Sequence, residues 1–178
     1  GALKKAREVV VIGGGFIGAE MADEMAKRGG PHVTIVEIAP QCMSLVFDEE
    51  FSGGIQERLL SRSVALKTGV KVEAIIGGDR VEGVRLAGGE TLRADLVLCA
   101  IGVTPNVDLA RNAGLRIGAT GAVWVDRTMR TSDPYIFACG DCAEKVSFFG
   151  HEPVPMRLAS IAAQEARIAG ANLFSVIR

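Results

Sequence analysis

A glycine-rich turn between a strand and a helix constrains this chain more than any other feature. The apolar run EVVVI at 8–12 is typical of a strand that is buried on both faces. The segment GGGFIG at 13–18 follows it and fits the pattern G-x-G-x-x-G. Apolar residues at helical spacing then predict a helix over 16–27, and HVTIVE predicts a second strand over 32–37. The start of the chain is therefore expected to form a strand–turn–helix–strand unit with parallel strands.

This arrangement suits a dinucleotide. Glycines allow the turn, the approach of a pyrophosphate and close helix packing, and the helix N-terminus favours anions. Glu37 lies 24 residues after Gly13, near the spacing of about 20 that is expected for the acid binding the ribose 2′-hydroxyl. No arginine follows in Ile38-Ala39-Pro40 to hold a 2′-phosphate, which favours NAD over NADP. A glycine-rich turn without a ligand is the alternative.

The rest of the chain predicts an α/β fold with an antiparallel meander in place of a helix, because glycines separate three short strands as in hairpins. Helices are expected at 48–62 with Asp48 as N-cap, at 106–112 with Asn106 as N-cap, and at 156–178. Gly29-Gly30-Pro31 is expected to end the first helix. Strands are expected at 64–67, 70–76, 80–86, 90–92, 95–101, 121–127 and 135–138.

Composition excludes several classes of function. The 20 basic and 21 acidic residues leave a net charge of -1, so nothing attracts nucleic acid or an anionic membrane. Aromatic residues make up 5% of the chain, too few for a single-strand binding surface. No apolar run reaches the roughly 18 residues of a membrane helix. Four cysteines without a secreted-type framework fit reduced thiols in the cytoplasm.

Four segments together resemble the pyridine nucleotide–disulfide oxidoreductase family: VVVIGGGFIGAEMA, VEIAP, ADLVLCAIGVTPN and YIFACGDCA. The stretch 156–172 is most similar to the NADH oxidase and coenzyme A-disulfide reductase branch. The resemblance implies a Rossmann-like three-layer ββα NAD-binding domain over 1–104 and the returning segment of an FAD-binding domain over 105–178. The first FAD half-domain and the C-terminal dimerisation domain have no counterpart here, so we expect a fragment.

For the full-length protein, the resemblance implies a homodimer that binds NAD(H) and FAD and passes hydride from NADH to FAD. Its electron acceptor would be a small molecule or a small redox protein, which the sequence does not identify. The fragment alone is expected to be inactive. Two rival functions stay open: a non-catalytic NAD-binding module, and a thiol redox protein that uses Cys139 and Cys142.

The resemblance also assigns site residues. The NAD side comprises Gly13, Gly14, Gly15, Phe16, Ile17, Gly18, Glu37 and Gly102, with Glu20 near the nicotinamide; the FAD side comprises Gly140, Asp141, Leu158 and Ala159. Asp141 would hold the ribityl hydroxyl, and Leu158 and Ala159 begin a helix aimed at the flavin ring. The alternatives are an exposed helical glutamate for Glu20, a strand-ending turn for Gly102, a capping aspartate for Asp141, and core packing for Leu158 and Ala159.

Two positions depart from the family pattern. Ser63 and Glu165 stand where relatives commonly carry glycine, which puts a helix cap and local flavin contacts in doubt. No metal site is expected, since the two cysteines of Cys139-Gly140-Asp141-Cys142 cannot complete a structural zinc site. The other cysteines and both histidines are expected to be structural: Cys42, Cys99, His32 and His151.

Overall fold

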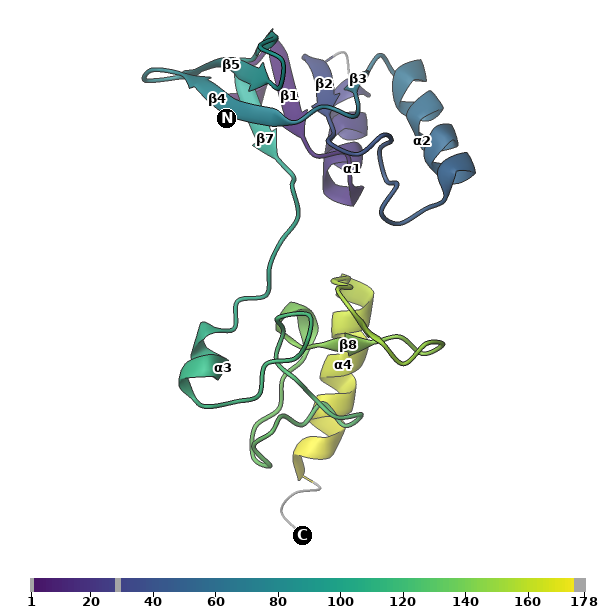
Figure 1. The fold of residues 1–178 in the computed structure, drawn as a ribbon, viewed down its shortest axis with the longest axis vertical. Coiled ribbons are helices and arrows are strands. Elements are labelled where there is room, and N and C mark those ends of the chain that lie inside the picture. Colours follow the sequence, from purple (N-terminus) through teal and green to yellow (C-terminus); the bar gives the residue numbers. More distant parts are fainter. Residues whose placement is uncertain (1, 28–29, 175–178) are drawn as a thin grey trace. The chain divides into compact units, whose positions relative to one another are not determined.

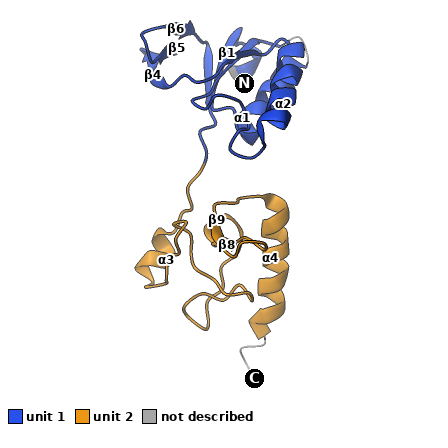
Figure 2. Cartoon of the chain, turned by 45° about the vertical axis from the view of Figure 1, so that its right-hand side comes forward, with its two compact units in different colours: residues 1–102 blue, residues 103–178 orange. Residues whose placement is uncertain are grey.

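The computed structural model describes residues 2–27 and 30–174. The chain divides into two units, Gly1–Gly102 and Val103–Arg178, shown in blue and orange in Figure 2. The expected boundary at 104/105 lies close to this division, and the assignment of the units to an NAD and an FAD domain stays a prediction. Gly29 and the expected helical end at 175–178 lie outside the described residues.

A four-stranded parallel sheet lies at the centre of unit 1 (Figure 1). Its order is β3-β2-β1-β7, with β1 at Glu8–Ile12, β2 at His32–Val36, β3 at Ala65–Lys67 and β7 at Leu96–Cys99. Val9, Val10 and Val11 of β1 are all at most 1% exposed, as the continuous apolar run predicts for a strand covered on both faces. A short 3-10 helix, η1 at Ala2–Lys4, precedes the sheet.

Two helices cover one face of this sheet. These are α1 at Phe16–Ala26 and α2 at Glu49–Ser61. Val9 and Val11 point to this side and pack with Ala22 and Leu59 in one buried cluster. The expected N-cap of α2 is confirmed, since Asp48 Oδ1 accepts a hydrogen bond of 3.1 Å from the Phe51 backbone N–H.

The other face carries the antiparallel meander β4-β5-β6, at Val72–Gly77, Val81–Leu86 and Thr91–Arg93. Val10 of β1 points to this side, as alternation along a strand requires, and packs with Val84 and Leu86 in a second buried cluster. Unit 1 is thus the three-layer ββα arrangement that the sequence predicts.

Ser63 closes the C-terminal end of α2. Its φ is 61°, in the left-handed region that glycine adopts most readily. The Ser63 N–H donates to the Leu60 carbonyl at 2.9 Å and the Val64 N–H to the Leu59 carbonyl at 3.1 Å. The helix end is therefore capped with serine at this position, where the sequence left the cap in doubt.

Unit 2 has little regular structure. It contains α3 at Asp108–Asn112, the 3-10 turn η2 at Gly140–Cys142, the hairpin strands β8 at Lys145–Val146 and β9 at Pro153–Val154, and α4 at Ala159–Asn172. The hairpin has no counterpart in the sequence-based prediction. The last helix begins three residues later than expected.

Three sequence-based predictions for unit 2 are wrong. The segments 121–127 and 135–138 are not strands, because their ladder contacts are isolated bridges such as Val123 with Ala143 and Phe137 with Arg130. The Asp126 carboxylate accepts bonds from the backbone N–H groups of Thr128 and Arg130, which turns the chain away from a ladder. Asn106 is not the N-cap of α3, whose cap residue is Val107.

Candidate functional site

The glycine turn after β1 has the geometry that a dinucleotide requires. Gly13 has a φ of 100°, and its N–H donates to the Val36 carbonyl at 2.8 Å, which ties the turn to β2. A Cβ on Gly18 would overlap the carbonyl oxygen of Gly13, so only glycine lets α1 approach the turn this closely. A Cβ on Gly15 would meet nothing within 4 Å. The side of the turn at Gly15, where α1 begins, is therefore open to a phosphate.

Glu37 lies beside this turn. Its Oε2 accepts a hydrogen bond of 2.5 Å from the Gly14 N–H, and its Oε1 accepts one of 2.7 Å from the Ala39 N–H. A carboxylate has about four lone-pair sites, so these two bonds leave acceptor capacity for a sugar hydroxyl. The acid expected to bind the ribose thus also orients the loop.

The segment after β2 packs against the glycine turn and forms hydrogen bonds that hold it. The Met43 N–H donates to the Gly14 carbonyl at 2.9 Å, and the Cys42 N–H donates to Gln56 Oε1 at 3.1 Å. Cys42 is fully buried, with its sulfur against Gly14. Burial, with a smaller contribution from the Glu37 charge, raises the pKa of the Cys42 thiol to about 11. Cys42 is therefore a packing residue, as expected. Nothing in the sequence indicates that it contacts the glycine turn.

The other residues assigned to the NAD side are accessible. Phe16 and Ile17 begin α1 with 48% and 56% of their surface exposed, and Glu20 is exposed on the same helix. Phe16 stacks edge-on with Phe47, which the sequence did not single out, at 6.0 Å between ring centroids. Gly102 has a φ of 95° and open space at its Cβ position. Among the described residues of unit 1, none forms an ion pair with Glu20.

The residues assigned to the FAD side lie in unit 2. Gly140, with a φ of 77°, and exposed Asp141 form the turn η2. Leu158 is the N-cap residue of α4 and Ala159 its first residue, and both are exposed, so the start of α4 is accessible rather than packed in a core. Cys142 Sγ donates to the Cys139 carbonyl at 3.4 Å, and all four cysteines are free thiols.

Two side chains around this turn were not predicted. Lys145 and Glu165 form an ion pair of 3.2 Å, and each side chain is only 9% exposed. Glu165 was singled out from the sequence only as a departure from the family pattern. Lys145 was not singled out, because lysine is normally a surface residue.

Across the part of the chain that the structure describes, no group of histidine, cysteine and acidic residues has the arrangement of a metal site. None of the described helices has the length and apolarity needed to cross a membrane.

A parallel sheet with a glycine turn at its carboxyl edge and an acid beside that turn defines a Rossmann-like dinucleotide-binding unit. The family model described as pyridine nucleotide-disulphide oxidoreductase matches residues 2–166. The chain belongs to this family, whose members are FAD-dependent enzymes that bind NAD(P)H.

Relatives agree with the family. An NAD(P)H sulfur oxidoreductase (CoA-dependent) of Pyrococcus abyssi is 38% identical over 169 residues, which are 95% of this chain and 37% of the relative. A crystal structure of an FAD-dependent pyridine nucleotide-disulphide oxidoreductase from Desulfovibrio vulgaris superposes with a TM-score of 0.90 at 40% identity, covering 96% of this chain and 43% of that one. The covalent putidaredoxin reductase–putidaredoxin complex gives 0.87 at 32% identity, covering 95% and 40%. This chain thus spans about two fifths of the length of these relatives.

Proposed function

We propose that this chain is the NADH-binding portion, with part of the FAD-binding portion, of an FAD-dependent oxidoreductase that transfers hydride from NADH to FAD. The single observation that carries the proposal is the glycine turn of unit 1, open at Gly15 and bordered by the Glu37 carboxylate. The family and the relatives reported above support the same activity for the protein as a whole.

The residues of unit 1 fit NADH in chemical detail. The open side at Gly15 and the N-terminus of α1 would receive the pyrophosphate. The remaining lone pairs of Glu37 would accept the ribose hydroxyls, and the same carboxylate would repel a 2′-phosphate. Gly102 leaves room for the coenzyme after β7. Exposed Glu20 lies one turn along α1 from Phe16, where it would be near the nicotinamide.

The residues of unit 2 fit a part of the FAD site. Asp141 presents an exposed carboxylate on a fixed turn, suited to a ribityl hydroxyl. The exposed N-terminus of α4 at Leu158 and Ala159 would favour negative charge on the flavin. FAD supplies the hydride-accepting chemistry, and the protein supplies binding and orientation.

The complete protein would be a cytoplasmic homodimer that reduces a small molecule or a small redox protein. Free thiols at all four cysteines support a reducing compartment. The putidaredoxin complex supports a redox-protein acceptor as one of the two choices. We expect no turnover from this chain by itself, because it spans only about two fifths of the length of these relatives.

The test is a titration of NADH against the chain, followed by coenzyme fluorescence. We expect saturable binding, weaker binding of NADPH, and a Kd for NADH raised about tenfold by Glu37→Gln, which removes the charged acceptor. Glu57→Gln, at an exposed position on α2, is the matched control and should bind like the wild type. Absence of saturation at millimolar NADH, or equal affinity in the Glu37 and Glu57 variants, contradicts the proposal.

A further inference from the structure

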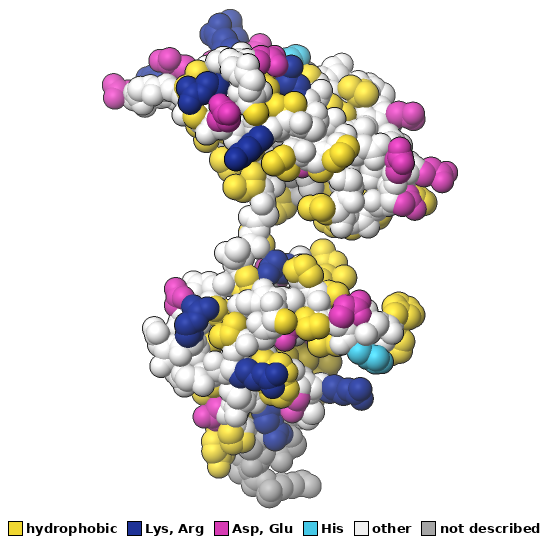
Figure 3. Space-filling model, viewed as in Figure 1, with side chains coloured by type: hydrophobic (Ala, Val, Ile, Leu, Met, Phe, Trp, Pro, Cys, Tyr) yellow, Lys and Arg dark blue, Asp and Glu magenta, His cyan; other side chains and the backbone are white. Residues whose placement is uncertain are grey.

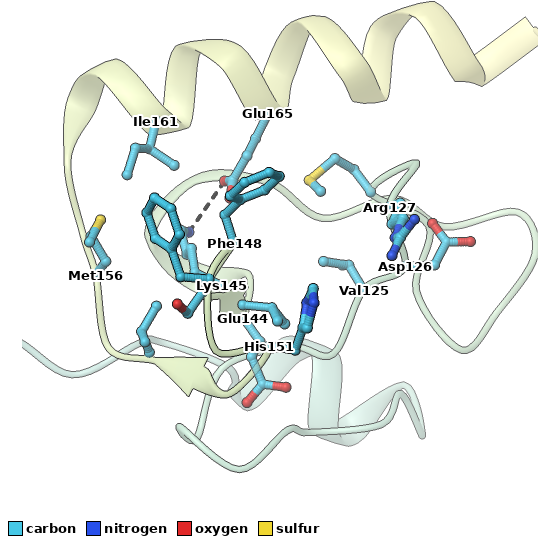
Figure 4. Close-up of a pocket in the computed structure, with 15 residues that line it drawn as sticks. Val125, Asp126, Arg127, Glu144, Lys145, Phe148, His151, Met156, Ile161 and Glu165 are labelled. Carbon is cyan, nitrogen blue, oxygen red and sulfur yellow. Dashed lines mark ion pairs between the residues drawn. The ribbon is translucent and has the colours of Figure 1, made fainter.

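The turn that carries Asp141 is held by two buried charges. Figure 4 shows Glu165 extending from α4 toward Lys145, with the ion pair drawn as a dashed line. Both residues line a hollow of about 920 Å³ in unit 2, whose other lining residues include Phe148, Met156 and Ile161. An ion pair among apolar side chains requires an explanation, because removing two charges from water offsets much of their attraction.

The hydrogen bonds of the pair supply that explanation. Glu165 Oε2 accepts from the Gly140 N–H at 2.7 Å. Lys145 Nζ donates to the Gly140 carbonyl and, at 2.9 Å, to the Ala143 carbonyl. The Lys145 ammonium group thus donates to two carbonyls, and the Glu165 carboxylate at 3.2 Å balances its charge. The pair therefore fixes both the N–H and the C=O of Gly140.

Holding the peptide groups of Gly140 also fixes the direction of the chain at this turn. Its φ of 77° is in the left-handed region and sets the direction in which the chain enters Asp141. Ala162 of α4 lies at ordinary contact distance from the Cβ position of Gly140, so the turn also rests against the helix. Glu165 is on the same helix, which starts at Ala159. The pair thus connects the Asp141 turn to the helix whose N-terminus is proposed to face the flavin.

We propose that Lys145 and Glu165 are positioning residues that orient the Asp141 carboxylate for FAD, an inference that rests on the proposed function. On this proposal Glu165 supports the FAD site rather than disturbing it. A purely stabilising role is a poorer explanation, because apolar residues of the same size commonly serve stability equally well.

The test uses the protein encoded by the complete reading frame that contains this chain. The dissociation constant of FAD is measured by recovery of flavin fluorescence for the wild type, Lys145→Met, Asp141→Asn and the variant with both substitutions. We expect Lys145→Met to weaken FAD binding about tenfold in the wild type but less than about twofold in the Asp141→Asn background, because coupled residues are not additive. Equal effects in both backgrounds would indicate general loss of structure and overturn the inference.

Two further variants keep the test decisive. Lys145→Met with Glu165→Gln leaves no unpaired buried charge and retains an acceptor for the Gly140 N–H, so it should fold even if Lys145→Met alone proves unstable. It should still shift the visible circular dichroism of bound flavin. Arg111→Met removes the exposed Arg111–Asp108 pair of the same unit and should change neither readout.

The outcomes separate the two proposals. If Asp141→Asn weakens FAD binding while the Lys145 variants do not, the positioning role is wrong and the proposed function stands. If the wild-type protein binds no FAD, both fail.

Discussion

The two units of this chain are stabilised in different ways. Among the described residues, both clusters of buried hydrophobic side chains lie in unit 1, on the two faces of its parallel sheet. The buried hydrophobic residues of unit 2 are small, namely Val107, Ala122, Val123, Ala143 and Ala169. Several large ones are exposed, with Tyr135, Phe148 and Phe149 each more than 80% exposed, and Figure 3 shows hydrophobic side chains at the surface of unit 2.

Unit 2 relies on acidic side chains that bind backbone N–H groups. Glu144 accepts from the Thr120 N–H, Asp126 from Thr128 and Arg130, and Glu165 from Gly140. Such bonds fix local conformation but contribute less to stability than burial of a continuous apolar core. The comparison teaches that unit 1 has a continuous apolar core of its own, whereas unit 2 depends more on hydrogen bonds to its backbone.

The largest effect is expected when the two units are produced as separate proteins, which tests this comparison directly. Residues 1–102 alone should unfold cooperatively and keep the NADH affinity of the whole chain, because the core and the glycine turn lie within them. Residues 103–178 alone should show no cooperative thermal transition. Circular dichroism melting and NADH titration of both pieces check this. A sharp transition in the isolated second piece would contradict the comparison.

The next largest effect is expected for Gly18→Ala. The new Cβ would overlap the Gly13 carbonyl, so α1 must move away from the turn. We expect a loss of about 3 kcal/mol in the free energy of unfolding of unit 1, together with weaker NADH binding. Urea unfolding measures the first and fluorescence titration the second.

Gly54→Ala is the matched control for this substitution. It lies in α2 with open space at its Cβ position and should stabilise the protein by about 1 kcal/mol. Equal behaviour of the two variants would show that the close approach at Gly18 is unimportant.

A smaller effect depends on pH. The thiol of Cys42 titrates near 9.0 in the unfolded chain but near 11 when buried beneath Gly14. Because the folded state holds the proton more tightly, the stabilisation is fully present below pH 9 and is lost as the pH rises toward 11. The stability of wild type minus Cys42→Ala, measured by urea unfolding, should fall across that range. A difference that does not change with pH would contradict the burial of this thiol.

The smallest effect is expected at Ser63. Its left-handed φ of 61° is unfavourable for a residue with a side chain. Ser63→Gly should therefore raise the free energy of unfolding by about 1 kcal/mol or less, without any change in NADH binding. A substitution that destabilises unit 1 would show that the serine side chain contributes to the cap.

The sequence predicted unit 1 better than unit 2 for a physical reason. In unit 1 a continuous apolar strand and a glycine turn each fit one arrangement, so β1, α1 and the place of Glu37 follow from spacing. In unit 2 the run GAVWVDR at 121–127 has the composition of a strand, but Asp126 binds backbone N–H groups and the ladder is limited to single bridges. Composition does not reveal where a strand has a partner.

The candidate site could likewise be predicted only in part from the sequence. The positions of Gly13 and Gly18 could be predicted because the turn and the close approach of α1 require glycine there, and Gly15 was predicted from the space that a phosphate would need. The support from Cys42, Met43 and Phe47 could not, because it depends on how the segment after β2 folds back onto the turn. Lys145 could not be predicted either, since its burial depends on two carbonyl acceptors and an ion-pair partner that only the folded chain brings together.

The contact between Glu37 and Gly14 has a consequence for changing coenzyme preference. The obvious route to an NADPH-using variant is to exchange Glu37 for a neutral or basic side chain. Where the new side chain has no acceptor oxygen, that exchange would also leave the Gly14 N–H without its acceptor, in the loop that is proposed to receive the diphosphate. A successful redesign would have to provide a new acceptor for that amide before it introduces a cation for the extra phosphate.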